Sequence, residues 1–244
     1  MKWINGGFNN VLKVDRVTRR FGRVTAVDDV SFEIQPGEMV GFLGPNGSGK
    51  TTLLRVISTY LLPSSGTVLL DGLDVRRAPA EVRRRIGYLP ESNILYPRMR
   101  VWDYLKFAGE MRGLCGKQLA QRIDSFVQAL QLESVLEKRN GECSKGFRQR
   151  ISMAAVLLHR PPVILLDEPT IGLDPLQLFM VRDFLRELAK DRIVLFSSHI
   201  MQEVAAMTQR VLLIHQGKLI RDAVLPETVD GARQLENMFK EALV

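Results

Sequence analysis

Cysteine is scarce in this chain: only two of its 244 residues are cysteine, Cys115 and Cys143. Two cysteines do not make a disulfide framework, and their scarcity fits a reducing cytosol. Long apolar runs are also missing, because no uninterrupted stretch approaches the roughly 18 residues of a membrane span. The first ten residues, MKWINGGFNN, lack the apolar core of a signal peptide. We therefore expect a soluble chain.

The composition that remains is that of an ordinary globular protein, with 45% apolar and 25% charged residues. This balance argues against a largely disordered chain, and the length allows one large domain or two small ones. The net charge of +7 fits a solvated basic surface, a nucleic-acid partner or a nearby anionic membrane face. Because the arginine clusters are dispersed and carry no interleaved aromatic residues, no nucleic-acid partner is expected.

The order of apolar segments predicts an α/β fold. Alternating apolar residues in 11–17 and 27–34 predict antiparallel strands. Later strands alternate with helices, which is typical of a mostly parallel sheet. The expected later strands are residues 39–44, 66–72, 86–90, 163–169, 192–198 and the hairpin 210–222, and the expected helices are residues 50–60, 145–159, 175–190 and one after His199. Between Ser92 and Gly141, helical spacing without β-branched runs predicts a mainly helical insertion.

Residues 44–51, GPNGSGKT, match the pattern G-x-x-x-x-G-K-[ST] between an expected strand and an expected helix. The glycines let successive backbone N–H groups point at phosphate oxygens, and the helix N-terminus adds partial positive charge. Lys50 can reach the β- and γ-phosphates, and the Thr51 hydroxyl can ligate Mg²⁺. A nucleoside triphosphate site is therefore predicted here, formed by Gly44, Pro45, Asn46, Gly47, Ser48, Gly49, Lys50, Thr51 and Thr52.

Two later strand ends agree with this site. In VILLDEPT, Asp167 and Glu168 follow a buried strand, where α/β proteins bind ligands. Asp167 can hold Mg²⁺ through water. Glu168 is expected on the other side of the strand end, with Pro169 keeping its backbone extended, and can orient or deprotonate a water. His199 follows another buried strand, and beside these motifs we expect it to bond the γ-phosphate.

A second stretch, CSKGFRQR at 143–150, also predicts a helix N-terminus that could hold an anion. A modest domain with a strong phosphate loop has no evident use for another phosphate site of its own. The other two histidines, His159 and His215, are expected to be structural.

Taken together and in this order, the phosphate loop, CSKGFRQR, VILLDEPT, IGLD at 171–174 and SSH resemble the nucleotide-binding subunit of an ATP-binding cassette (ABC) transporter. The resemblance implies a P-loop NTPase core that binds ATP and Mg²⁺ and hydrolyses ATP. It also implies an N-terminal antiparallel β subdomain and an inserted α-helical subdomain. The predicted organisation is one ATPase domain over residues 11–222, with the helical subdomain at about 92–160 and a short C-terminal helical extension over 223–244.

In that family two subunits pair head to tail, and the signature helix of one closes over the ATP of the other. By resemblance, Ser144 and the Gly146 N–H would contact the partner's γ-phosphate, and Asp174 would communicate across the interface. Phe21 lies where the family places a ring that stacks on adenine. The resemblance thus assigns CSKGFRQR to a neighbour's nucleotide, the neighbour being a second ATPase subunit and most simply an identical chain.

Three positions depart from the family pattern. Lys145 replaces the first signature glycine, Phe147 replaces the signature glutamine, and Glu91 replaces a glutamine near the metal. The Glu91 carboxylate can still approach Mg²⁺ or a water, but it cannot donate an amide hydrogen bond. These substitutions resemble a branch of exporter ATPases that includes gliding-motility-associated and antibiotic- or polysaccharide-export subunits.

Transport also requires a pore, which this chain does not supply. The resemblance implies a separate transmembrane permease subunit, docked where Glu91 meets the helical insertion. The ATPase would then lie peripherally at the cytoplasmic face of the inner or plasma membrane, with its basic surface under anionic headgroups. Two alternatives stay open: a soluble relative that acts on nucleic acid or ribosomes, and a non-hydrolysing regulatory subunit.

Overall fold

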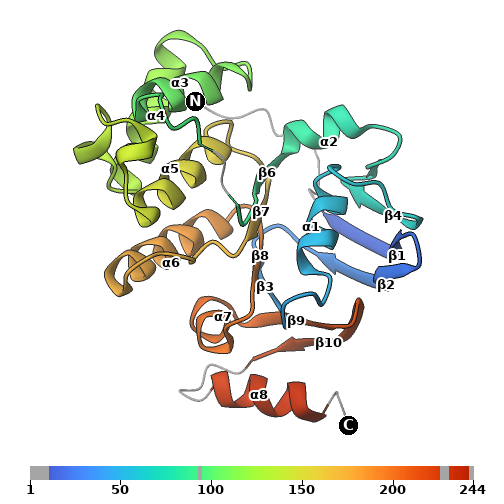
Figure 1. Ribbon diagram of the computed structural model, residues 1–244. Helices are drawn as coiled ribbons and strands as arrows, with labels where there is room; N and C mark the ends of the chain where they lie inside the picture. The colour runs from blue at the N-terminus through green and yellow to red at the C-terminus, as the bar shows by residue number, and fades with distance from the viewer. Residues whose placement is uncertain (1–10, 93–94, 226–230, 242–244) are drawn as a thin grey trace.

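The computed structural model describes residues 11–92, 95–225 and 231–241. At its centre lies a six-stranded sheet with the strand order β10-β9-β3-β8-β7-β6 (Figure 1). Strand β10 runs antiparallel to β9, whereas the other neighbours pair in parallel, which confirms the expected mostly parallel sheet. The strands are β3 Met39–Leu43, β6 Ile86–Leu89, β7 Val163–Asp167, β8 Ile193–Ser198, β9 Arg210–His215 and β10 Lys218–Val224.

A second, four-stranded sheet with the order β2-β1-β4-β5 is antiparallel throughout. Its strands are β1 Leu12–Phe21, β2 Val24–Ile34, β4 Ser65–Leu70 and β5 Leu73–Asp74. Their alternating side chains bury one face against the rest of the molecule. The predicted N-terminal antiparallel unit is therefore present.

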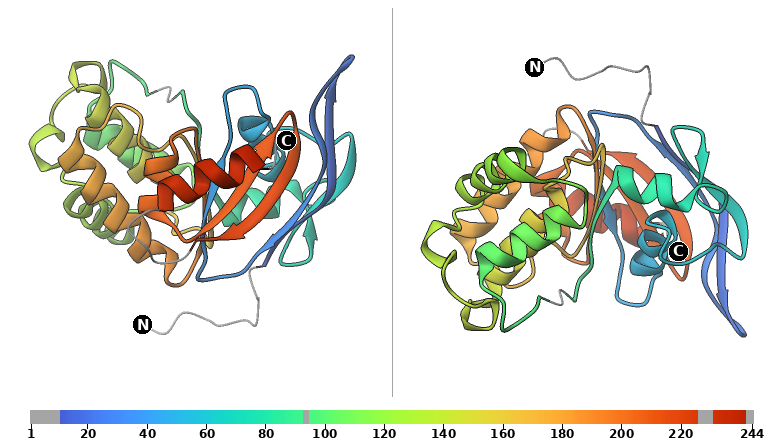
Figure 2. Two further views of the ribbon diagram at one scale, coloured as in Figure 1. Left: turned by 90° about the horizontal axis from the view of Figure 1, so that it is seen from below. Right: turned by 90° about the horizontal axis from the view of Figure 1, so that it is seen from above.

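Three helices gather at one end of the molecule and the antiparallel sheet lies at the other, with the central sheet between them (Figures 1 and 2). The three are α3 Val101–Glu110, α4 Gly116–Ala129 and α5 Lys145–Leu157. Two short 3₁₀ turns, Glu133–Val135 and Asn140–Glu142, lie between α4 and α5. The remaining helices are α1 Lys50–Ile57, α2 Pro79–Arg85, α6 Pro175–Ala189, α7 Met201–Met207 and α8 Gly231–Glu241. Helix α8 packs on α7.

Two apolar cores cover the two faces of the central sheet, because successive strand residues point to opposite sides. In β7, Val163 and Leu165 pack with the antiparallel sheet and α1. Ile164 and Leu166 pack with the helices of the opposite core. This double burial fixes the register of β7, and hence the position at which Asp167 leaves the sheet.

Some boundaries differ from expectation. Helix α1 ends at Ile57 rather than at residue 60, and Thr59 then takes a φ of +64°. Helix α2 was not expected, since its sequence PAEVRRR contributes one buried residue, Val82. Strand β10 continues past the expected domain boundary at 222. Two predictions lie partly outside the described residues. One is the absence of a signal peptide at 1–10, and the other is the C-terminal extension, of which 226–230 and 242–244 are not described.

Within the described part of the chain, we find no helix that is both long and apolar enough to cross a membrane.

Candidate functional site

The phosphate loop connects β3 to α1 at the carboxyl end of the central sheet, where ligands bind in open α/β sheets. Gly49 has a φ of +108°, and a Cβ at this position would collide with the carbonyl oxygen of Ala26. One backbone hydrogen bond holds the loop from outside, and a second holds the turn that supplies it. The Gly217 N–H donates to the Ser48 carbonyl at 2.9 Å, and the Asp28 N–H donates to the Gly217 carbonyl at 2.8 Å. The loop is therefore fixed by β2 and by the β9–β10 turn.

A pocket of about 360 Å³ opens beside this loop. It unites residues that the sequence predicted from four separate stretches of the chain. Its lining consists of Ala26, Asn46, Gly47, Gly49, Lys50, Thr51, Thr52, Glu91, Asp167, Glu168 and His199. The predicted residues Gly44, Pro45 and Ser48 belong to the same loop but do not line the pocket, and Phe21 does not line it either.

Lys50 is the cation of this pocket. Its Nζ donates to the Gly44 carbonyl at 2.6 Å and to the Pro45 carbonyl at 3.1 Å. Burial lowers the pKa of Lys50, while the carboxylates of Glu168 and Asp167 act in the opposite direction. A buried ammonium group at the start of a helix is well suited to a phosphate anion.

Asp167 ends β7 and is only 1% exposed. Its Oδ1 accepts a hydrogen bond from the Ser197 hydroxyl at 2.6 Å, which fixes the carboxylate. Its Oδ2 is buried and has no hydrogen-bond partner among the described residues. Such an unpaired buried oxygen is costly unless a ligand completes it.

Glu168 corrects one expectation. It has a φ of +51°, in the left-handed region, so its backbone is not extended as Pro169 suggested. The Glu168 N–H donates to the Ser197 hydroxyl at 3.0 Å, and the side chain lines the same pocket as Asp167 instead of pointing away. Burial raises the pKa of Glu168, and the hydrogen bond from His199 partly offsets this rise. A carboxyl group tuned in this way can serve as a general base near neutral pH.

The oxygen ligands that the pocket offers fit Mg²⁺ bound together with a nucleotide. Two buried carboxylate oxygens of pocket-lining residues, Asp167 Oδ2 and Glu168 Oε2, have no hydrogen-bond partner in the described ranges. In the same ranges no group of three His, Cys, Asp or Glu side chains could hold a metal by itself. Mg²⁺ is commonly held by one or two carboxylates together with phosphates and waters, which is the donor set available here.

His199 enters the pocket from the end of β8. Its Nδ1 lies 2.9 Å from Glu168 Oε1, and 40% of its side chain is exposed. The ring therefore keeps an exposed part while its Nδ1 is hydrogen-bonded to Glu168. His159 instead bonds the Ile86 carbonyl through Nε2 at 3.2 Å, and His215 packs edge-on against Phe239.

The signature stretch lies outside this pocket. Ser144 caps helix α5, its Oγ accepting a hydrogen bond from the Phe147 N–H at 3.3 Å. Gly146 is buried, and a Cβ there would collide with the amide oxygen of Gln177. Asp174 caps α6 by accepting from the Gln177 N–H at 2.9 Å. Neither Ser144 nor Gly146 lines the nucleotide pocket of its own chain.

Glu91 lines a second pocket of about 350 Å³ as well as the first. The second pocket is lined by Glu91, Ser92, Lys145, Arg148, Gln149 and Ile171. The Glu91 carboxylate thus lines one cavity together with the cationic side chains of Lys145 and Arg148. The stem of Lys145 also packs over Gly172, where an added Cβ would lie 2.6 Å from its Cδ.

Sequence reasoning missed two residues that support the site. Ser197 bonds both Asp167 and Glu168, and Gln149 donates to the Pro169 carbonyl at 3.1 Å. Both lie inside the motif stretches that the sequence singled out. Nothing in the sequence marks which of these polar residues point inward.

Phe21 remains a prediction. It ends β1 and is 45% exposed, with the Arg19 guanidinium 4.5 Å from the centre of its ring. It pairs in register with Val24 at the start of β2, the strand that also carries Ala26. An adenine ring beyond the pocket would have to extend along this hairpin to reach it.

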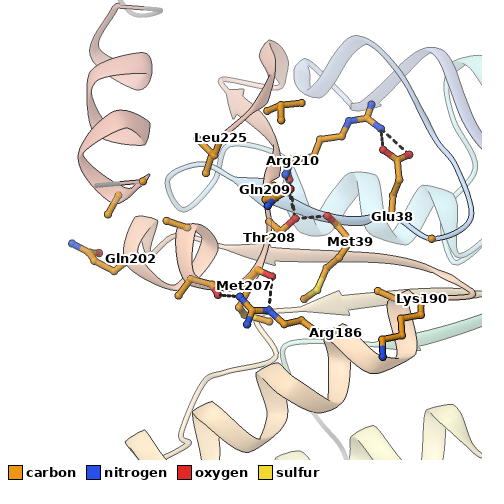
Figure 3. A pocket seen from close by; sticks show the side chains of 17 residues that line it. Glu38, Met39, Arg186, Lys190, Gln202, Met207, Thr208, Gln209, Arg210 and Leu225 are labelled. Carbon is orange, nitrogen blue, oxygen red and sulfur yellow. Dashed lines mark hydrogen bonds and ion pairs between the residues drawn. The ribbon is translucent and has the colours of Figure 1, made fainter. Parts of the chain in front are cut away.

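A larger pocket of about 970 Å³ lies elsewhere, between α6, α7 and the start of α8 (Figure 3). Its main charged groups bond neighbouring protein atoms. Arg186 donates to the Ala206 carbonyl at 2.6 Å, and Arg210 donates to Glu38 Oε1 at 2.8 Å. Residues on both sides of the undescribed stretch 226–230 line it. We therefore place the chemistry in the smaller pocket.

Comparisons with known proteins show the family and the fold of this chain. The family described as ABC transporter matches residues 27–171. The ABC transporter ATP-binding protein NatA of Bacillus subtilis is 40% identical over 225 residues, covering 91% of this chain and 92% of that protein. The Nod factor export ATP-binding protein I of Paraburkholderia xenovorans is 34% identical over 212 residues, covering 86% and 70%.

Solved structures show the same fold. An ATP-binding subunit of an ABC transporter superposes with a TM-score of 0.85 at 26% identity, covering 96% of this chain and all of that chain. A dimeric ATP-binding cassette bound to ADP and Pi superposes with a TM-score of 0.78 at 24% identity, covering 89% and 100%, a likeness of fold alone. This chain belongs to the ABC transporter family, of which it carries the ATP-binding ATPase domain.

Proposed function

We propose that this chain hydrolyses ATP in a head-to-tail pair of ATPase subunits and thereby powers export through a separate membrane-spanning permease. The observation that carries the proposal is the Glu168–His199 pair, which lies in one pocket with Lys50 and Asp167. This combination places a cation, a metal-binding carboxylate and a base around a single cavity. Such a set is suited to phosphoryl transfer to water.

Each residue has a distinct role in this proposal. The loop Gly44–Thr52 cradles the phosphates and Lys50 binds their β- and γ-oxygens, while Thr51, Asp167 and Glu91 face the metal. Mg²⁺, when bound, neutralises charge that develops on the phosphate oxygens. Glu168 orients and deprotonates the attacking water. His199 donates through Nε2 to the γ-phosphate in its imidazolium form, in which both ring nitrogens carry a proton and Nδ1 still donates to Glu168.

The proposed pairing uses the N-terminus of α5, which lies outside the nucleotide pocket of its own chain. Ser144 and Gly146 lie at the N-terminus of α5, which favours an anion through its unpaired N–H groups. They do not line their own chain's pocket, so a second copy is required to bring them to a γ-phosphate. Asp174, which caps α6, would face the same interface, and Phe21 would stack on adenine.

The proposed permease contact lies beside Glu91 on the helical insertion. Tyr96 is 52% exposed, and its ring meets Tyr104 and Phe107 edge-on at 6.2 and 5.8 Å between centroids. Met111, at the end of α3, is 71% exposed. An exposed aromatic group of this kind is typical of a protein-binding surface. The names of two relatives, both Nod factor export ATP-binding proteins, support export as the direction of transport.

The same proposal sets the organisation and location of the chain. Residues 11–222 form the ATPase domain with the helical subdomain at about 92–160, and residues from 223 onward form an extension that contains α8. The chain lies at the cytoplasmic face of the inner or plasma membrane, held by its permease.

The proposal is tested by recovering the chain from membranes in mild detergent. We expect a multi-span membrane protein to co-purify, and we expect Tyr96→Ser with Phe107→Ser to release it without loss of ATP binding. Val24→Ser is the matched control, because Val24 is 66% exposed but lies on the antiparallel sheet. Consistent recovery with ribosomes or nucleic acid instead would refute the transporter role.

A further inference from the structure

Gln149 connects the signature helix to the catalytic strand of the same chain. It lies in α5, is 6% exposed, and its Nε2 donates to the Pro169 carbonyl at 3.1 Å and the Glu168 carbonyl at 3.4 Å. A carboxamide reaches both carbonyls because its two N–H groups share one plane. The contact joins two motifs that are separated by about twenty residues in the sequence.

Glu168 depends on such contacts for its conformation. A φ of +51° is costly for a residue with a Cβ, and such a backbone persists where its surroundings fix it. On one side, the Glu168 N–H donates to the Ser197 hydroxyl at 3.0 Å and to the Ser197 carbonyl at 3.2 Å. On the other side, Gln149 holds the carbonyl. The position of the base is thus set from β8 and from α5 together.

Helix α5 connects the capped N-terminus and Gln149 in one continuous helix. Ser144 caps it, and Gln149 follows five residues later, about 7.5 Å along the axis at 1.5 Å per residue. The next residue, Arg150, donates through Nη1 to the Leu130 carbonyl at 2.6 Å and to the Gln131 carbonyl at 3.1 Å. Ser144 and Gln149 thus belong to one rigid element, which Arg150 anchors to the end of α4.

We propose that Gln149 is a positioning residue that makes the placement of this chain's Glu168 depend on what the N-terminus of α5 contacts in the second copy. The inference rests on the proposed head-to-tail pair. When Ser144 engages the partner's nucleotide, α5 fixes the Glu168 carbonyl through Gln149. Each subunit's base is then aligned when the other site is filled, and ATP hydrolysis is cooperative in ATP concentration.

The test replaces Gln149 by Met, which keeps the length and helix propensity of the side chain but removes its donor. We expect the affinity of the isolated subunit for ATP to stay within about twofold of the wild type. We expect kcat to fall about tenfold or more, because a base misplaced by about 1 Å loses much of its effect. The Hill coefficient for ATP should fall to unity. A purely structural role would instead change stability and leave the Hill coefficient unaltered.

Ser152→Ala is the matched control, since Ser152 is buried in the same helix one turn further on. It should keep the wild-type Hill coefficient. If Gln149→Met does not fold, the same measurements are made on Gln149→Asn. Asparagine keeps the carboxamide, but its side chain is one methylene shorter and cannot reach the same carbonyls.

Wild-type turnover and cooperativity in the folded variant would overturn the role of Gln149 alone. A wild type that hydrolyses ATP without cooperativity and never pairs in the presence of ATP would overturn the proposed pair, and this inference with it.

Discussion

His199 Nδ1 and Glu168 Oε1 lie 2.9 Å apart, so the ends of the neighbouring strands β7 and β8 meet in one hydrogen bond. The two residues were expected to act separately, one on water and one on the γ-phosphate. The bond makes them a unit, because the ring orientation of His199 and the carboxylate orientation of Glu168 now depend on each other. Substitution of either residue should therefore change the orientation of the other side chain.

Lys50→Ala should weaken ATP binding by about a hundredfold or more. The substitution removes charge-assisted hydrogen bonds to phosphate, each of about 1.5–3 kcal/mol. Equilibrium titration with a fluorescent ATP analogue measures the effect, and circular dichroism checks the fold. Unchanged nucleotide affinity would refute the phosphate-loop assignment.

Glu168→Gln should bind ATP normally but lower turnover by about a hundredfold or more, since a general base contributes roughly 10²–10⁴-fold. ATP should then hold the variant as a dimer, because the bridging phosphate is not removed. Phosphate release and light scattering with ATP measure the two effects. Turnover like that of the wild type would remove Glu168 from the mechanism.

The same substitution should also stabilise the nucleotide-free protein at neutral pH. Burial raises the pKa of Glu168 above its ordinary value of 4.5, so its contribution to stability is present below 4.5 and is lost as pH rises through the native pKa. Glutamine does not ionise, so the variant escapes this loss. Urea unfolding at about pH 7.5 should show the variant to be the more stable, and the difference should shrink at about pH 4.5. A difference that is independent of pH contradicts this account.

His159 should make the protein sensitive to mild acid. Burial, and secondly the charge of Arg112, lowers the pKa of His159 from 6.5 to about 4. Its stabilising effect is complete above 6.5 and is lost as pH falls toward 4, by up to roughly 3 kcal/mol. His159→Gln can still donate to the Ile86 carbonyl but does not titrate. Unfolding free energies at about pH 7 and about pH 5 should therefore differ less in the variant than in the wild type.

Glu91→Gln and Lys145→Gly should be coupled, because the two residues face one pocket with opposite charges. The double variant should lose less stability than the sum of the single losses, by about 0.5 kcal/mol. A double-mutant cycle at low salt measures the coupling, and high salt should reduce it. Strict additivity would mean that Glu91 and Lys145 contribute to stability independently of each other.

The sequence predicted the elements that rest on strong periodicity or on a motif. The central strands, the antiparallel unit and the phosphate loop all follow from apolar patterns and from GPNGSGKT. Helix α2 was missed because its packing depends on one buried side chain, Val82, and on the surrounding chain rather than on a local pattern.

The conformation of Glu168 could not be predicted for a related reason. Pro169 locally favours an extended predecessor, whereas the native φ of +51° is imposed by Ser197 and Gln149, which come from elements far away in the sequence. The sequence therefore indicated which carboxylates belong to the site. The directions in which the Asp167 and Glu168 side chains point become known only from the tertiary structure.

The Gly217 N–H bonds the Ser48 carbonyl of the phosphate loop, and Asp28 in turn bonds Gly217, and this support has a thermodynamic consequence. The amides of the cradle lose their freedom when the chain folds, so an arriving triphosphate meets a preorganised receptor and little further entropy is lost on binding. Nucleotide association should accordingly show a small heat-capacity change, and any large change measured with the paired subunits would report the closing of their interface.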